Sequence, residues 1–228
     1  MVQCLVPMDA IEPQFPSHAS QQHFYVAVDR IHFKMVDSSL SRIHYYSVRF
    51  YLQETLMDLL GVIWRCRPGL PIVICCCSRD ELDSLCSAVT DLPSISLSYL
   101  YSDLSEKDRT LTLERFRQAT IAWNHFVNTE SIEDYKSEIN ELKSHLIVTT
   151  DACLPLASGE CPISSRVLIN YELPTKKEIY MRRMAACLAQ DGIVVNLVVG
   201  GEVVTLKSVE ENSGLCVKEM PINISDML

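Results

Sequence analysis

Short apolar runs alternate with longer amphipathic stretches along most of the chain. Stretches that are apolar at every second position, or throughout, predict strands. The predicted strands are 23–28, 70–77, 95–101, 146–150, 166–173, 193–199 and a short one around 215–218. Apolar residues three and four positions apart predict helices. The predicted helices are 47–65, 79–89, 106–118, 131–145 and one near 202–210. The run LPIVICCC (70–77) is typical of a strand buried on both faces.

Polar residues mark the starts of three helices. Residues 78–81 and 175–178 each place a hydroxyl three positions before a glutamate, which is the spacing of a capping box. Ser105 is a candidate N-cap for the helix that follows it. The second box predicts a helix that carries the run YMRRMAACLAQDG (180–192).

Alternating strands and helices predict βαβ units with right-handed crossovers. We therefore expect an α/β fold: a single doubly wound domain, with a mostly parallel sheet flanked by helices. Residues 1–22 contain several prolines and show no sustained period, so we expect an irregular N-terminal tail there and the domain over 23–228.

Composition supports an ordinary globular protein but not a nucleic-acid binder. Of the 228 residues 48% are hydrophobic and 21% charged, and the net charge is −9 with a pI of about 5.1. An acidic chain gains no general attraction to RNA or DNA. No apolar run is long enough to cross a bilayer and no signal-peptide pattern is present, so we expect an intracellular protein of the nucleus or cytoplasm.

The ten cysteines predict buried, reduced thiols instead of disulfides. Cys75, Cys76 and Cys77 are consecutive within an apolar run, so at most alternate ones face the same side of a strand. Cys86 and Cys187 lie on apolar faces of predicted helices. Because there is no CxxC pair and no Cys/His cluster at zinc spacing, no metal site is expected.

The common motifs of α/β enzymes are missing from the sequence. No P-loop, dinucleotide fingerprint, GxSxG elbow or HExxH is present, and we predict no cofactor. The turn VVGGEVV (198–204) fits a tight connection better than a phosphate site. In TTDA (149–152) an aspartate follows a predicted strand, and a turn or helix-capping role is favoured over a catalytic one.

The order of segments resembles the C-terminal RecA-like lobe of DEAD-box RNA helicases, most closely the eukaryotic initiation factor 4A branch. The matching segments are HFYVAVDRIHFK (23–34), IVICCCSRDELDSL (72–85), LYSDLSEKDRTLTLERFR (100–117), LIVTTDA (146–152), VLINYELPTKKEIYMRRM (167–184) and EMPINISDML (219–228). The given chain has no counterpart of the family's N-terminal lobe, which supplies the P-loop lysine and the Mg²⁺-binding acidic motif. By this resemblance, the chain alone is not expected to hydrolyse ATP.

The resemblance also implies a degenerate nucleotide-binding edge. In the family motif HRIGRxGR, two arginines stabilise phosphate charge. Aligned with it, this chain keeps Arg183, but Ala186 and Ala189 replace those two arginines. The family motif Ala-Arg-Gly-x-Asp ends in an aspartate that contacts the ribose. The nearest equivalent of this aspartate in the chain is Glu160.

RNA-contacting positions of the family are partly retained. They are Thr150, Asp151, Arg109 and Arg117. Glu106 replaces a glutamine of that set, and Tyr101-Ser102 replaces a His-Gly pair, which adds negative charge and removes phosphate contacts. The resemblance therefore implies weak RNA binding at most.

Relative to the family, the chain carries insertions near 35–50 and 119–145. Aromatic residues in the second insertion are candidates for a partner surface: Trp123, Phe126 and Tyr135. The alternative is a neutral surface extension. Because initiation-factor-4A lobes dock on helical-repeat scaffolds, the resemblance implies a protein partner of that kind or a helicase-associated complex.

Taken together, these residues predict a non-catalytic, pseudo-helicase module that acts through protein interaction, in an RNA-related or gene-expression complex. One alternative is a residual RNA-binding module. Another is an ATP-dependent RNA helicase-like factor that requires a separate first lobe. The fold alone does not choose between them.

Overall fold

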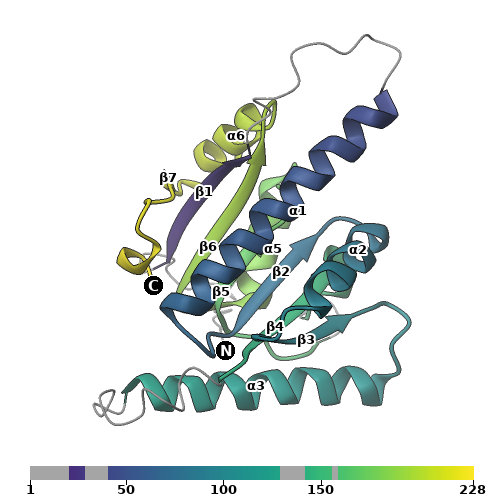
Figure 1. Cartoon of the computed structure of the whole chain (residues 1–228), viewed down its shortest axis with the longest axis vertical. Coiled ribbons are helices and arrows are strands. Elements are labelled where there is room, and N and C mark those ends of the chain that lie inside the picture. Colours follow the sequence, from purple (N-terminus) through teal and green to yellow (C-terminus); the bar gives the residue numbers. More distant parts are fainter. Residues whose placement is uncertain (1–20, 29–40, 129–141, 156–158) are drawn as a thin grey trace, which may run out of the picture.

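The computed structural model describes residues 21–28, 41–128, 142–155 and 159–228. Its centre is a seven-stranded sheet in the order β3-β4-β2-β5-β6-β1-β7, with every neighbouring pair parallel (Figure 1). The strands are β1 (Gln22–Val28), β2 (Ile72–Cys76), β3 (Ile95–Leu100), β4 (Ser144–Thr150), β5 (Ser165–Asn170), β6 (Leu188–Val199) and β7 (Val217–Glu219). The predicted α/β class is confirmed, with the described sheet wholly parallel.

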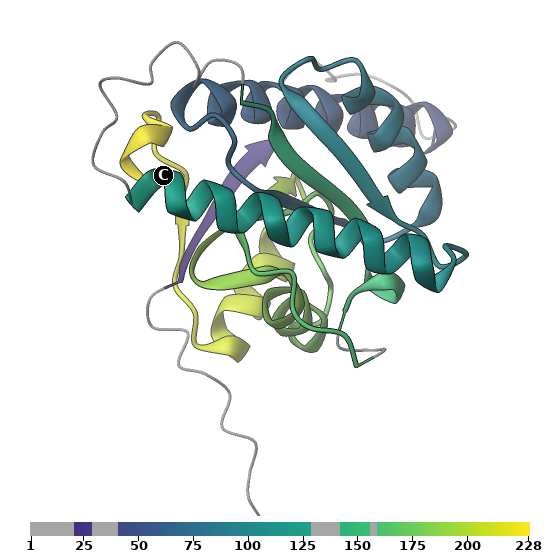
Figure 2. The same cartoon turned by 90° about the horizontal axis from the view of Figure 1, so that it is seen from below.

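Helices cover both faces of the sheet. The helices are α1 (Ser41–Cys66), α2 (Arg79–Thr90), α3 (Glu106–Asn128), α5 (Lys177–Cys187) and α6 (Val203–Ser213), with short 3-10 turns η2 (Asp151–Cys153) and η3 (Ile224–Asp226). Viewed along the layers, α1 and α2 lie on one face and α3, α5 and α6 on the other (Figure 2). This is the doubly wound arrangement that right-handed crossovers produce.

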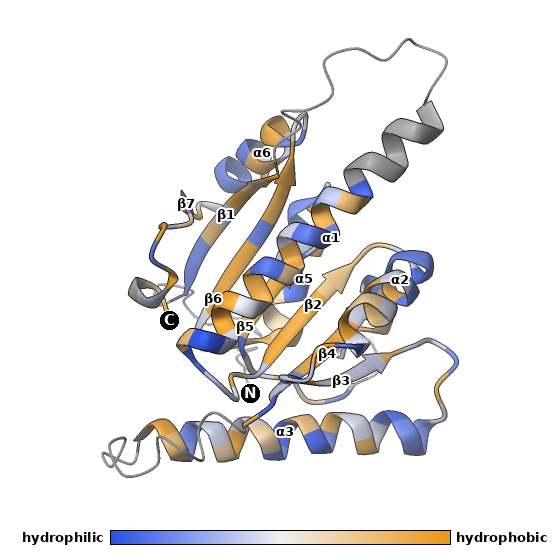
Figure 3. Ribbon diagram, in the orientation of Figure 1, coloured by the Kyte–Doolittle hydropathy of each residue, from blue (hydrophilic) through white to orange (hydrophobic). Residues whose placement is uncertain are grey.

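Strand β2 lies in the middle of the core, as its unbroken apolar sequence predicts. All five of its residues are buried. Ile72, Ile74 and Cys76 pack into the cluster beneath α1 and α2, whereas Val73 and Cys75 pack into the cluster beneath α3 and α5. The three consecutive cysteines therefore do alternate, and Cys77 is exposed. Strand β2 is hydrophobic throughout and β6 is mostly so, with Gln190, Asp191 and Asn196 as its polar residues, while α1 and α3 carry both kinds of residue (Figure 3).

Two of the three predicted helix caps are present. The Oγ of Ser78 accepts a hydrogen bond from the Glu81 N–H at 3.2 Å, and the Oγ of Ser105 accepts one from the Asp108 N–H at 3.1 Å. The predicted cap at Thr175 is wrong. Helix α5 begins one residue later, at N-cap Lys176 without a side-chain cap, so the threonine hydroxyl lies out of register with the first free N–H groups.

Several predicted boundaries differ from the structure. Helix α3 continues ten residues beyond 118. The predicted helix 131–145 lies mostly outside the described residues, and its last two residues belong to β4, where they pair with β3. Residues 188–192, expected at the end of α5, pair as the start of β6. Sheet pairing therefore overrides local helical spacing at both junctions.

The two insertions are only partly described. Residues 41–50 of the first insertion form the N-terminal part of α1, and residues 119–128 of the second form the end of α3. The predicted tail also lies outside the described residues, except that Gln22 already pairs with Ile193 in β1. Within the described chain, none of the helices combines the length and hydrophobicity of a membrane span.

Candidate functional site at the carboxyl ends of the strands

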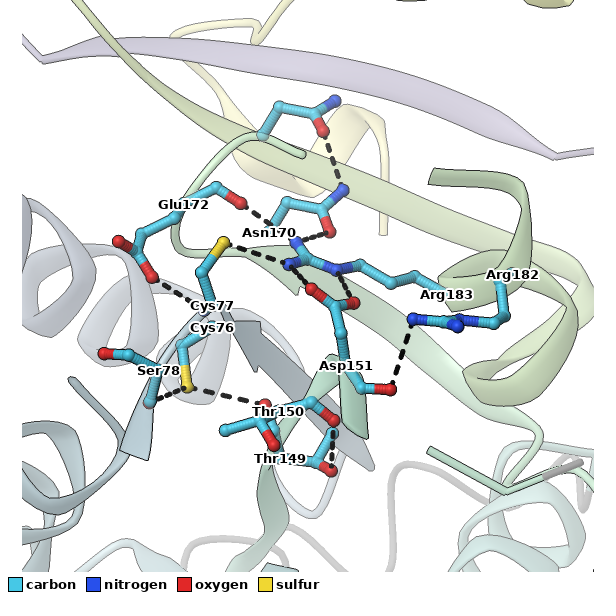
Figure 4. A network of polar contacts seen from close by, with 11 residues as sticks. Cys76, Cys77, Ser78, Thr149, Thr150, Asp151, Asn170, Glu172, Arg182 and Arg183 are labelled. Atoms are coloured by element: carbon cyan, nitrogen blue, oxygen red, sulfur yellow. Dashed lines mark hydrogen bonds and ion pairs between the residues drawn. The ribbon is translucent and has the colours of Figure 1, made fainter. Parts of the chain in front are cut away.

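Three neighbouring strands end beside one buried arginine. Cys77 follows β2, Asp151 follows β4, and Glu172 lies two residues after β5. Arg183 reaches over these strand ends from α5 (Figure 4). The carboxyl ends of adjacent parallel strands are where open α/β sheets bind their ligands. In this chain the position is occupied by the guanidinium of Arg183.

All five N–H donors of Arg183 are engaged within the protein. Nε and Nη2 bind the two carboxylate oxygens of Asp151 at 2.7 and 2.8 Å. Nη1 donates to the Asn170 Oδ1 and to the Glu172 carbonyl, both at 2.9 Å, and Nη2 also donates to the Cys77 Sγ at 3.5 Å. The arginine is 0% exposed. A guanidinium has five donors, so no donor remains for a phosphate.

The ion pair with Asp151 stabilises the charge of the buried arginine. Burial alone lowers the pKa of Arg183, but the hydrogen bonds and charge of Asp151 more than offset it and leave the pKa raised. The Asp151 side chain is 19% exposed and the arginine is fully enclosed. A buried pair of this kind is costly to break from one side, because the remaining charge is left without a partner.

A chain of polar side chains runs from Arg183 across the sheet. Asn170 donates to the Asn196 Oδ1 at 2.8 Å, and Asn196 donates to the Tyr180 hydroxyl at 3.3 Å. That hydroxyl lies 3.0 Å from the Nδ1 of His23. Burial raises the pKa of Tyr180, so the phenol stays neutral. The network links α5 to strands β5, β6 and β1 through buried groups.

The surroundings of the exposed Cys77 thiol at this edge disfavour its reactive form. The N–H of Cys77 donates to the Glu172 carboxylate at 2.7 Å. Burial around the sulfur, and then the charge of Glu172, raise the pKa of Cys77. A raised pKa disfavours the thiolate, which is the reactive form. Among the described side chains, no cluster of His, Cys, Asp and Glu is arranged to hold a metal ion.

The two alanines predicted to mark the nucleotide edge are packing residues. Ala186 is 0% exposed and belongs to the apolar cluster beneath α5. Ala189 is half-buried at the start of β6, where its carbonyl accepts a hydrogen bond from the Gln21 Nε2 at 2.9 Å. Neither methyl group can supply a charge to a phosphate.

A second ion pair joins two predicted site residues of different roles. The Nε of Arg109 donates to the Glu160 Oε1 at 2.7 Å, and its Nη2 donates to the Oε2 at 2.5 Å and to the Cys153 carbonyl at 2.8 Å. The hydrogen bonds that Arg109 donates to Glu160 raise the pKa of Arg109. Arg109 aligns with an RNA-contacting residue of the family, and Glu160 with the ribose-contacting residue. The positive charge of Arg109 is therefore balanced by the carboxylate of Glu160.

The remaining predicted RNA-contact residues each interact with another group of the protein. The Thr150 hydroxyl donates to the Cys153 Sγ at 3.4 Å at the end of β4. Arg117 is exposed on α3 and pairs with Glu114 at 2.6 Å. Asp151 is held by Arg183, as described above. Arg182, exposed beside it, donates to the Asp151 carbonyl at 3.3 Å.

The predicted partner surface needs a correction at Trp123. This side chain is 9% exposed and packs into the core, where a Cβ on Gly69 would lie 3.3 Å from its ring. Trp123 is seven residues after the buried Phe116, so helical spacing could have placed both on the inner face of α3. Phe126 is half-exposed, and Tyr135 lies outside the described residues.

Sequence reasoning also missed the buried asparagines. Asn170 and Asn196 are 0% exposed and face each other in the register of β5 and β6. The available signal was a single amide within each of two otherwise apolar strands. A buried polar group requires a hydrogen-bonding partner, so two such groups in neighbouring strands predict a contact.

Sequence comparisons relate the chain to RNA helicases. No family model matches the chain. It is 24% identical over 201 residues to the eukaryotic initiation factor 4A of Cryptosporidium parvum, a match that covers 87% of this chain and 43% of the relative. It is 26% identical to the ATP-dependent RNA helicase eIF4A of Eremothecium gossypii (83% and 41%) and 25% identical to the helicase FAL1 of Mycosarcoma maydis (87% and 44%).

Solved structures share the fold. A DEAD-box protein from Methanococcus jannaschii aligns with a TM-score of 0.56 at 18% identity, covering 90% of this chain and 43% of that one. Escherichia coli SrmB, bound to the regulator of ribonuclease activity A, aligns with 0.58 at 16% (90% and 92%). The C-terminal domain of Dbp5 aligns with 0.56 at 15% (92% and 94%).

By fold and by these matches, the chain is similar to the C-terminal RecA-like lobe of DEAD-box helicases. Within that class its sequence relatives are the eIF4A and FAL1 helicases. The chain spans less than half the length of these curated relatives.

Proposed function

We propose that this chain is a non-catalytic helicase-like lobe that acts by binding another protein. One observation carries the proposal: all five donors of Arg183 are engaged by the protein itself. Ala186 and Ala189 stand where the family has its phosphate-stabilising arginines. Of the three arginines in the family motif, two are replaced, and the third, Arg183, has no donor left for the charge that develops on a transferred phosphate.

The expected effect on catalysis is large. An arginine finger contributes about a thousandfold or more to the rate of phosphoryl transfer. Two of the motif's arginines are absent, and the third, Arg183, is bound to Asp151. ATP hydrolysis would therefore be no faster than that of an N-terminal lobe alone. Supplying an N-terminal lobe in trans would not restore the missing charges, because they belong to this lobe.

Solved structures of similar domains support a protein as the partner. SrmB was solved in complex with the regulator of ribonuclease activity A, and the C-terminal domain of Dbp5 in complex with Gle1 and IP6. These complexes belong to those proteins. For this chain, we propose a partner of the same general kind: a helical-repeat scaffold or a helicase-associated complex.

The test is a reconstituted ATPase assay. The N-terminal lobe of an eIF4A relative is mixed with this chain and with saturating RNA, and the control mixture contains that relative's own C-terminal lobe. We expect hydrolysis no faster than that of the N-terminal lobe alone. RNA-stimulated hydrolysis comparable to the control would instead favour a helicase-like factor that needs a separate first lobe.

A residual RNA-binding module is the second candidate, because exposed Arg117 and Arg182 and half-exposed Thr150 remain on this surface. RNA affinity measured against salt concentration separates the two candidates. The protein-binding role predicts weak affinity with a shallow salt slope. Micromolar or tighter binding at physiological salt with a steep slope would favour the RNA-binding role.

A further inference from the structure

Two neighbouring tyrosine rings, inclined at 56° to each other, lie at the carboxyl end of β3. Tyr99 is 43% exposed, and its ring centroid lies 4.9 Å from that of Tyr101. The guanidinium of Arg79, at the start of α2, lies 4.8 Å from the Tyr101 ring centroid. Tyr101 contacts both other side chains, and we call the three residues the tyrosine column, of which Tyr99 is the exposed end. Tyrosine and arginine are the residues that carry most binding energy at protein interfaces.

Hydrogen bonds hold the column in place before any partner binds. The Tyr101 hydroxyl donates to the Asp83 carboxylate. Arg79 pairs with Asp103 at 3.1 Å, although both side chains are more than half exposed. Tyr101 is thereby fixed from the hydroxyl end and from one ring face. Such preorganisation lowers the entropy that binding must overcome.

The charge around the column favours a basic partner. Asp83 and Asp103 contact the column directly, and the same two segments, α2 and the one that leads into α3, also carry Asp80, Glu106 and Asp108. The cations of the same segments are Arg79, whose charge is matched by Asp103, and Lys107. Acidic groups therefore outnumber basic ones, which opposes the phosphates of RNA and attracts an arginine or lysine.

We propose that the tyrosine column (Tyr99, Tyr101 and Arg79) binds an arginine-bearing segment of a protein partner. The incoming guanidinium stacks on the free face of Tyr99, as a cation does on an aromatic ring. The neighbouring carboxylates then accept its N–H groups, since each carboxylate has lone pairs beyond those used here. The inference deepens the proposed function, and it rests on that function in taking a protein as the binding partner.

The experiment measures the binding of three labelled probes to the full chain. The first is a twelve-residue Gly/Ser peptide with three arginines, the second is the same peptide with three glutamates, and the third is a uridine 12-mer. Tyr99→Ala removes the open end of the column, and Tyr99→Phe keeps the ring. Phe50→Ala is the matched control, because Phe50 is also an exposed aromatic side chain (58%) but lies on α1.

We expect the arginine peptide to bind and the glutamate peptide not to. An exposed cation–π contact corresponds to about a 2- to 5-fold change in affinity, so Tyr99→Ala should weaken binding of the arginine peptide by that factor. Tyr99→Phe and Phe50→Ala should bind it like the original chain. Thermal unfolding of each variant verifies that the fold is intact.

Three results would overturn the inference: equal binding of the arginine peptide by Tyr99→Ala, equal binding of the glutamate peptide, or no binding of the arginine peptide at millimolar concentration. Tighter binding of the uridine 12-mer that Tyr99→Ala abolishes would identify an RNA site instead and overturn it too. The ATPase test is independent of these probes. The peptides can therefore fail while the lobe is still shown to be non-catalytic, and the reverse also holds.

Discussion

Arg183 and Arg182 are neighbours in the sequence with opposite environments. Arg183 is fully buried with its donors engaged, whereas Arg182 is exposed and makes one long hydrogen bond to a carbonyl. The resemblance to the helicase family predicts that Arg183 is kept, but not what it binds. Asp151 and Cys77 are 32 and 106 positions from Arg183 and meet it only because β4, β2 and β5 are adjacent. Its other partners, Asn170 and Glu172, precede it by only 13 and 11 positions.

We predict that Arg183→Met destabilises the protein by about 3–5 kcal/mol, the usual cost of leaving one member of a buried ion pair without its partner. The matched variant Arg182→Met should change stability by less than about 0.5 kcal/mol, as surface substitutions do. Urea unfolding monitored by circular dichroism measures both. Equal stabilities of the two variants would show that the Arg183 network does not hold the fold together.

His145, half-buried on β4, should make stability depend on pH. Burial lowers its pKa in the folded state below the ordinary value. As the pH falls through about 6.5, the unfolded chain takes up a proton before the folded one, so stability decreases toward acid. The variant His145→Gln should lose this part of the decrease. Identical slopes for the two proteins between pH 7 and 5 would contradict the prediction.

At the scale of elements, the sequence predicts strand and helix interiors better than their ends. The run 72–76 is recognisable because it is apolar on both faces, and the cap at Ser78 because its hydroxyl lies three residues before Glu81. The start of β4 was not predictable from local pattern. Ser144 and His145 are polar and continue a helical sequence, and they are extended because they pair with β3.

The two predicted capping boxes provide a direct comparison. Ser78→Ala should destabilise the protein by about 1 kcal/mol, because the hydroxyl satisfies a free N–H at the start of α2. Thr175→Ala should have an effect below about 0.5 kcal/mol, since Thr175 is exposed and lies outside the cap of α5. Thermal unfolding of the two variants decides the matter. A larger loss for Thr175→Ala would contradict the observed start of α5.

At the scale of the whole molecule, alternating strands and helices predict the α/β class, but not which strands are neighbours. The ion pair between Arg109 and Glu160 joins residues 51 positions apart, and nothing in the spacing of either residue indicates it. Trp123 differs, because its spacing of seven residues from the buried Phe116 indicates an inner position on α3. The degenerate edge at Ala186 and Ala189 was recognised only by alignment with the helicase family.

The central claim is that other groups of the protein accept hydrogen bonds from all the N–H donors of Arg183. The Nε–H resonance of this arginine, assigned by comparison with Arg183→Lys, tests the claim directly. We predict a resonance that exchanges slowly with water, because Nε–H is buried and bonded to Asp151 at 2.7 Å, and that does not shift when an ATP analogue and RNA are added. A rapidly exchanging resonance, or one that shifts on addition of the nucleotide, would contradict it.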